Sequence, residues 1–137
     1  MKGPPIPMST ILENHHVLAV HDVRKSAEFY VNALDFVIVA EPDGWVFLRK
    51  DRCMIMLGEC PDDMPASDLG CHSYFSYLHV DNADTYHARI EASGLAVRLG
   101  QLADEPWGMR EFSLTTPDGH RMRIGHHLAS SGSKPHD

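Results

Sequence analysis

The chain repeats one pattern of predicted secondary structure, and this repetition constrains the fold more than any other feature. Each half carries an apolar strand, a helix with one apolar face and three further strands. The halves align at a shift of about 60 residues, which pairs Val20 with Val80 and the helix cap Asp22 with Asn82. Two copies of a βαβββ unit predict an α+β fold. The modules are expected to form a curved, cup-like mixed sheet with the helices outside.

The individual elements follow from residue periodicity and turn signals. In the first half we predict strands at 16–20, 36–40, 45–48 and 53–57, with a helix beginning at Val23. In the second half we predict strands at 74–80, 97–99, 110–115 and 120–124, with a helix from Asn82 to a stop at Gly94. The alternative is a generic α+β domain whose halves resemble each other by accident.

The boundaries divide the chain into five segments. We expect residues 1–13 to form an irregular, proline-containing arm, 14–58 the first βαβββ module and 59–71 a polar connector. Residues 72–127 are expected to form the second module, and 128–137, which are small and polar, a loose tail. A chain of 137 residues suits one ordinary domain, since 43% of its residues are hydrophobic and 23% charged.

Composition excludes several classes of function. A net charge of -7 argues against a nucleic-acid partner, which requires a basic face. No apolar run is long enough to span a bilayer, and no signal peptide is visible at the start. The three cysteines form no C-x-x-C pair, which favours a reduced, cytoplasmic location over a disulfide framework.

Motifs in both halves resemble a known superfamily. The first half carries H-x-x-x-x-V-x-D from His15 to Asp22, followed by F-Y and L-x-F at 29–36. The second carries P-W-G-x-x-E-F at 106–112 and P-D-G-H at 117–120. These residues resemble the vicinal oxygen chelate superfamily of glyoxalases, bleomycin resistance proteins and dioxygenases, and in particular the bleomycin-resistance branch. The resemblance extends from about residue 15 to 124.

The resemblance implies a divalent metal only where the family's ligands exist. Enzymes of the group hold the metal with residues from the first and last strands of each module. His15 matches one ligand position, but Phe75 and Arg123 stand at two others, and neither offers a lone pair to a metal. Thioethers at 54–56 suit hard cations poorly. We therefore expect no metal or other cofactor; a nonstandard divalent-metal site using His15 and His79 is the alternative.

Strand alternation predicts which side chains face the cup. In strand 74–80 we expect Phe75, Tyr77 and His79 to face inward, and Tyr74, Leu78 and Val80 to face the helices. His15 shares the inward parity of the first strand, Trp45 and Trp107 offer stacking faces, and the last strand directs two arginines inward or to the rim. The predicted ligand-binding residues are His15, Trp45, Phe75, Tyr77, His79, Trp107, Arg121 and Arg123.

Each of these side chains also has a plain interpretation. Phe75 and Tyr77 can simply fill the inside of the sheet, the two arginines can be solvated charges, and Trp107 can close a tight turn. Glu111, beside Arg110, is expected to make a surface or subunit ion pair.

The leading functional hypothesis is a metal-free protein that sequesters a small organic ligand, aromatic or anionic, as in antibiotic resistance. No catalytic residue is predicted, because no cysteine has an identifiable base beside it. The alternatives are a metal-dependent lyase, isomerase or oxygenase of the glyoxalase or dioxygenase type, and a subunit whose cup is only core. The resemblance also implies a homodimer, in which the acidic connector borders the partner's cup.

Overall fold

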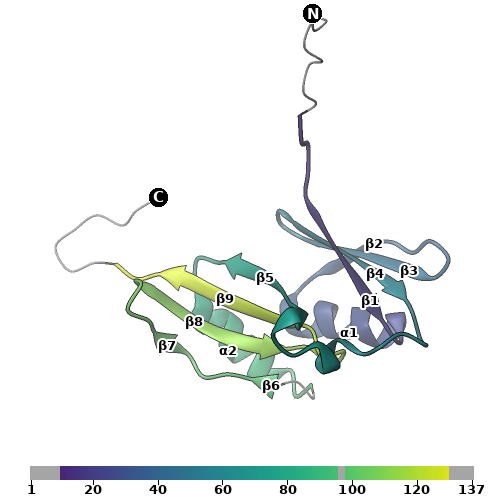
Figure 1. The fold of residues 1–137 in the computed structure, drawn as a ribbon. Helices are drawn as coiled ribbons and strands as arrows, with labels where there is room; N and C mark the ends of the chain where they lie inside the picture. Colours follow the sequence, from purple (N-terminus) through teal and green to yellow (C-terminus); the bar gives the residue numbers. More distant parts are fainter. Residues whose placement is uncertain (1–9, 96–97, 130–137) are drawn as a thin grey trace, which may run out of the picture.

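A computed structural model describes residues 10–95 and 98–129, which fold as two successive units (Figure 1). The order of elements is the same in both, apart from one additional short strand in the second. The first unit contains β1 (His15–Val20), α1 (Val23–Leu34), β2 (Val37–Ala40), β3 (Trp45–Lys50) and β4 (Cys53–Glu59). The second contains β5 (Tyr74–His79), α2 (Ala83–Ala92), β6 (Arg98–Leu99), β7 (Ala103–Asp104), β8 (Met109–Thr115) and β9 (Arg121–His127). A 3₁₀ helix, η1 (Ala66–Ser73), joins them.

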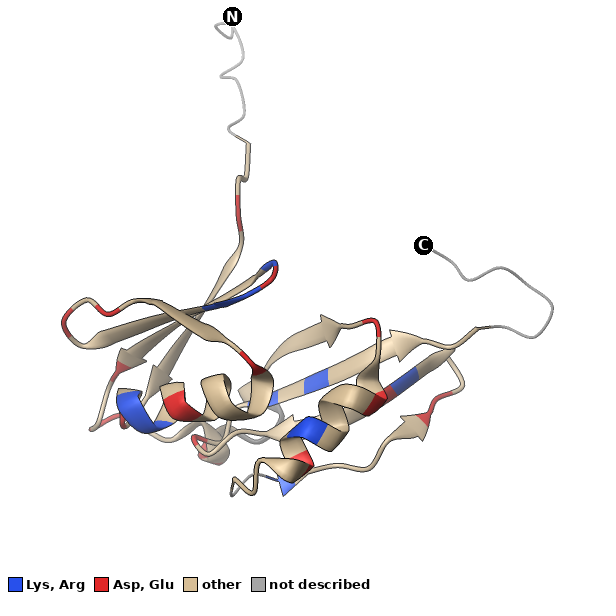
Figure 2. Cartoon of the chain, turned by 180° about the vertical axis from the view of Figure 1, so that it is seen from behind, with Lys and Arg blue, Asp and Glu red and all other residues tan. Residues whose placement is uncertain are grey.

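The two units share one strand topology. The first sheet has the order β1-β4-β3-β2 and the second the order β5-β9-β8-β6, with β7 also paired to β8. In each unit the first strand lies parallel to the last, and the remaining pairs are antiparallel. Figure 2 shows both helices on the same side of the molecule, in front of the sheets. The paired βαβββ modules and the α+β fold predicted from the sequence are therefore confirmed, with the strands divided between two hydrogen-bonded ladders.

Local signals set the helix boundaries as expected. The Asp22 carboxylate accepts hydrogen bonds from the backbone N–H groups of Arg24 and Lys25, and the Asn82 side chain accepts one from Thr85. These acceptors satisfy N–H groups that have no partner within the helix. Gly94, just beyond α2, adopts a φ of 67° that favours glycine, so the predicted stop lies where the helix ends.

One hydrophobic core joins the two modules on their helix-facing side. Side chains from both sheets and both helices form a single buried cluster. Polar links support it: the Ser26 hydroxyl of α1 donates to the Asp118 carboxylate in the second module, and the guanidinium of Arg89 on α2 lies 3.3 Å from the Asp35 carboxylate after α1. Asp118 thus connects the modules, in addition to its place in a turn. Main members of the core are Leu18, Phe29, Tyr30, Leu48, Ile55, Leu57, Ile90, Phe112, Leu114, Met122 and Ile124.

The structure also differs from the sequence-based expectations in its connections. The connector contains η1, and β7 is an additional short strand; neither was predicted. Residues 1–9 of the predicted arm, residues 130–137 of the tail, and Val97 of the predicted strand 97–99 lie outside the described residues. Within residues 10–95 and 98–129, no helix combines the length and apolar character needed to cross a membrane.

Candidate functional site

The second sheet has one face packed on the core and one open face. Met122 and Ile124 on β9 are buried, so alternation directs Arg121 and Arg123 to the opposite side. Strand register then places the neighbours of these arginines on the same open face. Ser113 pairs with Arg123, Thr115 pairs with Arg121, and Glu111 lies opposite Gly125.

Three side chains of the open face converge on Glu111. The hydroxyl of Tyr77 on β5 donates to Oε2 at 2.6 Å, and the indole Nε1 of Trp107 donates to the same oxygen at 3.4 Å. A guanidinium nitrogen of Arg123 donates to Oε1 at 2.9 Å. Glu111 is only 3% exposed, so these donors compensate the cost of removing its carboxylate from water. We call Tyr77, Trp107, Glu111 and Arg123 the Glu111 cluster.

A glycine provides the space that the cluster requires. A Cβ placed on Gly125 would lie 2.3 Å from the Tyr77 hydroxyl and 2.9 Å from the Cβ of Glu111. Any larger residue at this position would therefore displace the hydrogen-bonded pair. Burial, and next the hydrogen bond to Glu111, raise the pKa of Tyr77 well above its ordinary value. The Tyr77 hydroxyl is thus a stable donor to the carboxylate at physiological pH.

The Glu111 cluster leaves two groups available to a ligand. The side chain of Arg123 is 43% exposed, and only one of its nitrogens is used by Glu111 in the hydrogen bonds of the described residues. Trp107 is 63% exposed, although its ring nitrogen is held by the carboxylate. The arrangement therefore presents a guanidinium and an indole face in fixed positions, which suits a planar or anionic group.

Sequence reasoning missed the role of Glu111: its ion pair is made with Arg123, and its carboxylate is buried rather than at the surface. Arg110 instead lies 2.6 Å from the Asp104 carboxylate and 3.1 Å from that of Asp84. Adjacent residues of a strand point to opposite faces, so Arg110 and Glu111 cannot share one ion pair within the sheet. The same alternation, counted from the apolar Phe112 and Leu114, was the signal that could have placed Glu111 on the open face.

Two histidines extend the aromatic surface beside the cluster. The rings of Tyr77 and His79 lie 4.8 Å apart, and His79 stacks on His127 of β9 with an interplanar angle of 22°. The centroids of the two histidine rings are 5.7 Å apart. His79 therefore joins the predicted residues Tyr77, Trp107 and Arg123 at one end of the open face, while Arg121 lies further along β9.

The predicted orientation of the first two residues of β5 is wrong, because the strand contains a β-bulge between Tyr74 and Ser76. Tyr74 is 41% exposed, and the Arg121 guanidinium lies 5.4 Å from the centre of its ring. Phe75 instead packs against the core, with edge-to-face contacts to His16 and His120. The bulge thus exchanges the expected roles: Tyr74 joins the open face, and Phe75 seals the junction of the modules. Leu78 and Val80 pack on the core as expected.

The other two predicted residues lie on the first sheet. Trp45 makes an edge-to-face contact with Phe47, and its ring covers Gly58, where a Cβ would lie 2.9 Å from the indole. His15 Nε2 lies 3.4 Å from the Glu13 carboxylate, which also binds Arg49. The structure therefore groups His15 and Trp45 separately from the Glu111 cluster.

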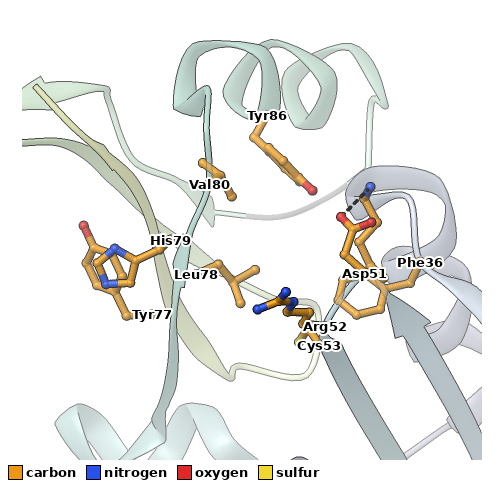
Figure 3. A pocket seen from close by; sticks show the side chains of 10 residues that line it. Phe36, Asp51, Arg52, Cys53, Tyr77, Leu78, His79, Val80 and Tyr86 are labelled. Atoms are coloured by element: carbon orange, nitrogen blue, oxygen red, sulfur yellow. Dashed lines mark ion pairs between the residues drawn. The ribbon is translucent and has the colours of Figure 1, made fainter. Parts of the chain in front are cut away.

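A cavity of about 390 Å³ lies between the modules, beside β5 and α2 (Figure 3). Leu78 points into it, toward Arg52 and Cys53 of the β3–β4 turn. Figure 3 shows the rings of Tyr77 and His79 on the other side of β5. Tyr77 and His79 nevertheless belong to the lining of the cavity, so β5 borders both the intermodule cavity and the open face.

Two βαβββ modules with helices on one side and open sheet faces on the other define the class of protein. The model of the Glyoxalase/Bleomycin resistance protein/Dioxygenase superfamily matches residues 13–124, so the chain belongs to this superfamily. The resemblance inferred from the sequence motifs is therefore confirmed.

Several relatives are bleomycin resistance or bleomycin-binding proteins. A bleomycin resistance protein of Geobacillus stearothermophilus is 27% identical over 133 residues, covering 88% of this chain and 100% of the relative. The solved structure of a bleomycin resistance determinant encoded on the transposon Tn5 superposes with a TM-score of 0.71 at 23% identity, covering 84% of this chain and 97% of that one. The solved structure of a bleomycin-binding protein complexed with bleomycin superposes with a TM-score of 0.71 at 22% identity. The match covers 84% of this chain and 98% of that one.

The residues described here do not fit the divalent metal of the superfamily's enzymes. In residues 10–95 and 98–129, no three His, Cys, Asp or Glu side chains gather where one ion could bind them. Arg123 directs a guanidinium at Glu111, and Phe75 faces the core. His15 adjoins the Glu13–Arg49 ion pair, and His79 stacks on His127.

Proposed function

We propose that this protein binds and sequesters a small organic molecule, without a resident metal ion, on the open face that carries the Glu111 cluster. The observation that supports this most directly is the convergence of Tyr77, Trp107 and Arg123 on one buried carboxylate. Fixing four functional side chains on an open face lowers the entropy that a ligand must overcome on binding. The names of the relatives favour an antibiotic as the class of ligand.

The chemistry of the face favours contact over catalysis. Trp107 and the row of Tyr77, His79 and His127 provide aromatic surfaces, and Arg123 provides a planar hydrogen-bond donor. Such groups hold a ligand by stacking and charge, which is sufficient for sequestration. The net charge of -7 attracts cations to the molecule as a whole, whereas Arg123 selects an anionic or acceptor group near the cluster.

A second copy of the chain completes the site in this proposal. The first sheet exposes Val17, Val37 and Trp45, and an exposed apolar sheet face is typical of a protein interface. A homodimer would place this apolar face opposite the Glu111 cluster of the partner, and so enclose the ligand. The cytoplasm, favoured by cysteine usage, remains the proposed location.

Tryptophan fluorescence tests the proposal directly. We would titrate the protein with metal-free bleomycin and with the anionic aromatic dye 8-anilinonaphthalene-1-sulfonate. At least one probe is expected to bind and quench Trp107. Arg123→Gln and Trp107→Phe are each expected to weaken that binding by about tenfold, equivalent to about 1.4 kcal/mol. Light scattering after size exclusion is expected to give twice the mass of the chain.

A matched variant controls for general effects of removing an indole. If the protein is a monomer, Trp45→Phe is expected to leave the affinity for the ligand unchanged. If it is a dimer, Trp45→Phe is expected to reduce the affinity, but by less than Trp107→Phe does. Unaltered affinity in both Arg123→Gln and Trp107→Phe would place the ligand elsewhere. Stoichiometric zinc, nickel, manganese or iron in protein purified without chelator would instead favour a metal-dependent enzyme.

A further inference from the structure

A polar cavity lies beyond the Glu111 cluster, at the other end of the second sheet. Its volume is about 720 Å³, and its lining includes Arg98, Arg121, and the hydroxyl-bearing residues Ser67, Thr115 and Thr116. None of the described residues that line it is an aspartate or glutamate. This composition is unusual on a chain with 19 acidic and 12 basic residues. The cavity is therefore locally cationic and rich in hydrogen-bond donors.

Strand register brings the two arginines together. Arg98 on β6 is the partner of Thr115 on β8, and Thr115 is the partner of Arg121 on β9. Directly paired residues of antiparallel strands point to the same face of a sheet. With strands about 4.8 Å apart, the two arginine Cα atoms lie roughly 10 Å from each other, with Thr115 between them. Their long side chains can thus approach one small group from two sides.

In the part of the chain that the structure describes, neither arginine has the carboxylate partner that most arginines of this protein have. Five of the eight arginines lie within 4.0 Å of an Asp or Glu oxygen: Arg24, Arg49, Arg89, Arg110 and Arg123. Among the described residues, the three without such a partner are Arg52, Arg98 and Arg121, and two of these share the cavity. Arg121 is positioned by the ring of Tyr74, which holds the guanidinium without neutralising its charge.

We propose that this cavity binds the phosphate group of a small molecule, between the guanidinium groups of Arg98 and Arg121. A tetrahedral dianion has three free oxygens, which two guanidinium forks and the Thr115 hydroxyl can satisfy together. A carboxylate has two oxygens, and a single guanidinium group can donate hydrogen bonds to both. Within residues 10–95 and 98–129, the lining holds no carboxylate that would compete for the two guanidinium groups.

The position of the cavity connects it to the ligand of the proposed function. Arg121 and Arg123 are two residues apart on β9 and share the open face. A phosphorylated ligand held at Arg121 would extend toward the Glu111 cluster. This connection rests on the proposed function, whereas binding of the phosphate group itself does not.

Calorimetric titration of the full chain with inorganic phosphate and phenyl phosphate tests the inference. Phenyl phosphate is expected to bind at least as tightly as phosphate, and benzoate more weakly than either. The double variant Arg98→Gln/Arg121→Gln is expected to lower the affinity for both phosphates by about tenfold or more, since it removes two charge-assisted contacts. Thr115→Val, which preserves the shape of the side chain, is expected to give a smaller loss.

Arg52→Gln is the matched control, because it removes the third arginine without a carboxylate partner. It is expected to bind phosphate as the native chain does, and thermal unfolding verifies that each variant is folded. The inference is overturned if the native chain binds no phosphate, if the double variant binds as well as the native chain, or if Arg52→Gln loses as much affinity. Benzoate binding as tight as that of phenyl phosphate would likewise reject a phosphate site.

The two proposals can fail independently. Trp107→Phe is expected to leave the binding of inorganic phosphate intact, because the indole lies at the Glu111 cluster. A protein that binds phosphate but neither aromatic probe would reject the proposed function and retain the phosphate site. The reverse result would reject the phosphate site alone.

Discussion

The two modules have the same topology but very different open faces. On the first sheet Trp45 lies opposite Gly58, and the neighbouring positions hold Phe47 and Met56. On the second sheet Glu111 lies opposite Gly125, and the neighbouring positions hold Ser113 and Arg123. In both modules a glycine of the last strand makes room for a large side chain: the indole of Trp45 in one, and the Tyr77–Glu111 pair in the other.

This difference shows that fold and binding surface are encoded on opposite faces of the same strands. The central helix-facing positions of both sheets are apolar and form one core. The open-face positions do not contribute to that core, so their composition can differ without a change in topology. The open face of the first sheet is apolar, and that of the second sheet is charged. The modules can therefore be compared position by position.

Core truncation is expected to have the largest effect, and to be equal in the two modules. Leu48 on β3 and Leu114 on β8 are 0% and 1% exposed. Leu48→Ala and Leu114→Ala should each lower the free energy of unfolding by about 2–5 kcal/mol, because each leaves a cavity. Urea denaturation monitored by circular dichroism measures the change. Val37→Ala, on the exposed face, serves as the control with a change within about 0.5 kcal/mol. Separate transitions for the two modules would contradict a shared core.

Alanine at the paired glycines should distinguish the open faces. In Gly125→Ala the added methyl group meets the buried Tyr77–Glu111 pair, so we expect a loss of about 1–3 kcal/mol. In Gly58→Ala it meets the edge of a partly exposed indole that can move, so we expect less than about 1 kcal/mol. Urea denaturation gives both values. A greater loss in Gly58→Ala would mean that the first face is the more rigid one.

The smallest expected effect is a dependence of stability on acidic pH that originates in the second module. Burial lowers the pKa of His120, so the folded state favours its neutral form. The stabilisation is present above the unfolded pKa of about 6.5 and is lost as the pH falls toward the lower folded value. His120→Gln should reduce the slope of unfolding free energy against pH below about pH 6.5. An unchanged slope in this variant would assign the dependence to other groups.

The first module has no equivalent acid-sensitive group at this place. Cys53 follows the β3–β4 turn, just as His120 follows the turn before β9. Burial raises the pKa of the Cys53 thiol. The thiol is therefore neutral throughout the acidic range. Cys53→Ala should leave the acidic slope unchanged, which makes it the matched control for His120→Gln.

The sequence was sufficient to predict the repeated topology, because its determinants are local. Alternation identified the strands, and Asp22 and Asn82 marked the helix starts through contacts within three residues. The direction of Arg121 and Arg123 followed from the apolar Met122 and Ile124 between and beside them. Each of these inferences requires only neighbouring residues along the chain.

The Glu111 cluster was not predictable in the same way, because its members meet only after three segments assemble. Tyr77 comes from β5, Trp107 from the loop before β8, and Arg123 from β9. Strict alternation also failed at Tyr74 and Phe75, since a bulge is a property of strand pairing that neither residue reveals by itself. Tertiary register, rather than local preference, decided these positions.

The bulge in β5 has an evolutionary consequence. The bulge accommodates one residue more than the pairing with β9 requires, so Tyr74 keeps Arg121 as its partner while Phe75 is the extra residue. Loss of the Phe75 codon would restore regular alternation, leave Tyr74 opposite Arg121, and remove the ring that packs between the modules. Relatives of identical topology can thus gain or lose this intermodule seal by length variation alone, with no substitution on the open face.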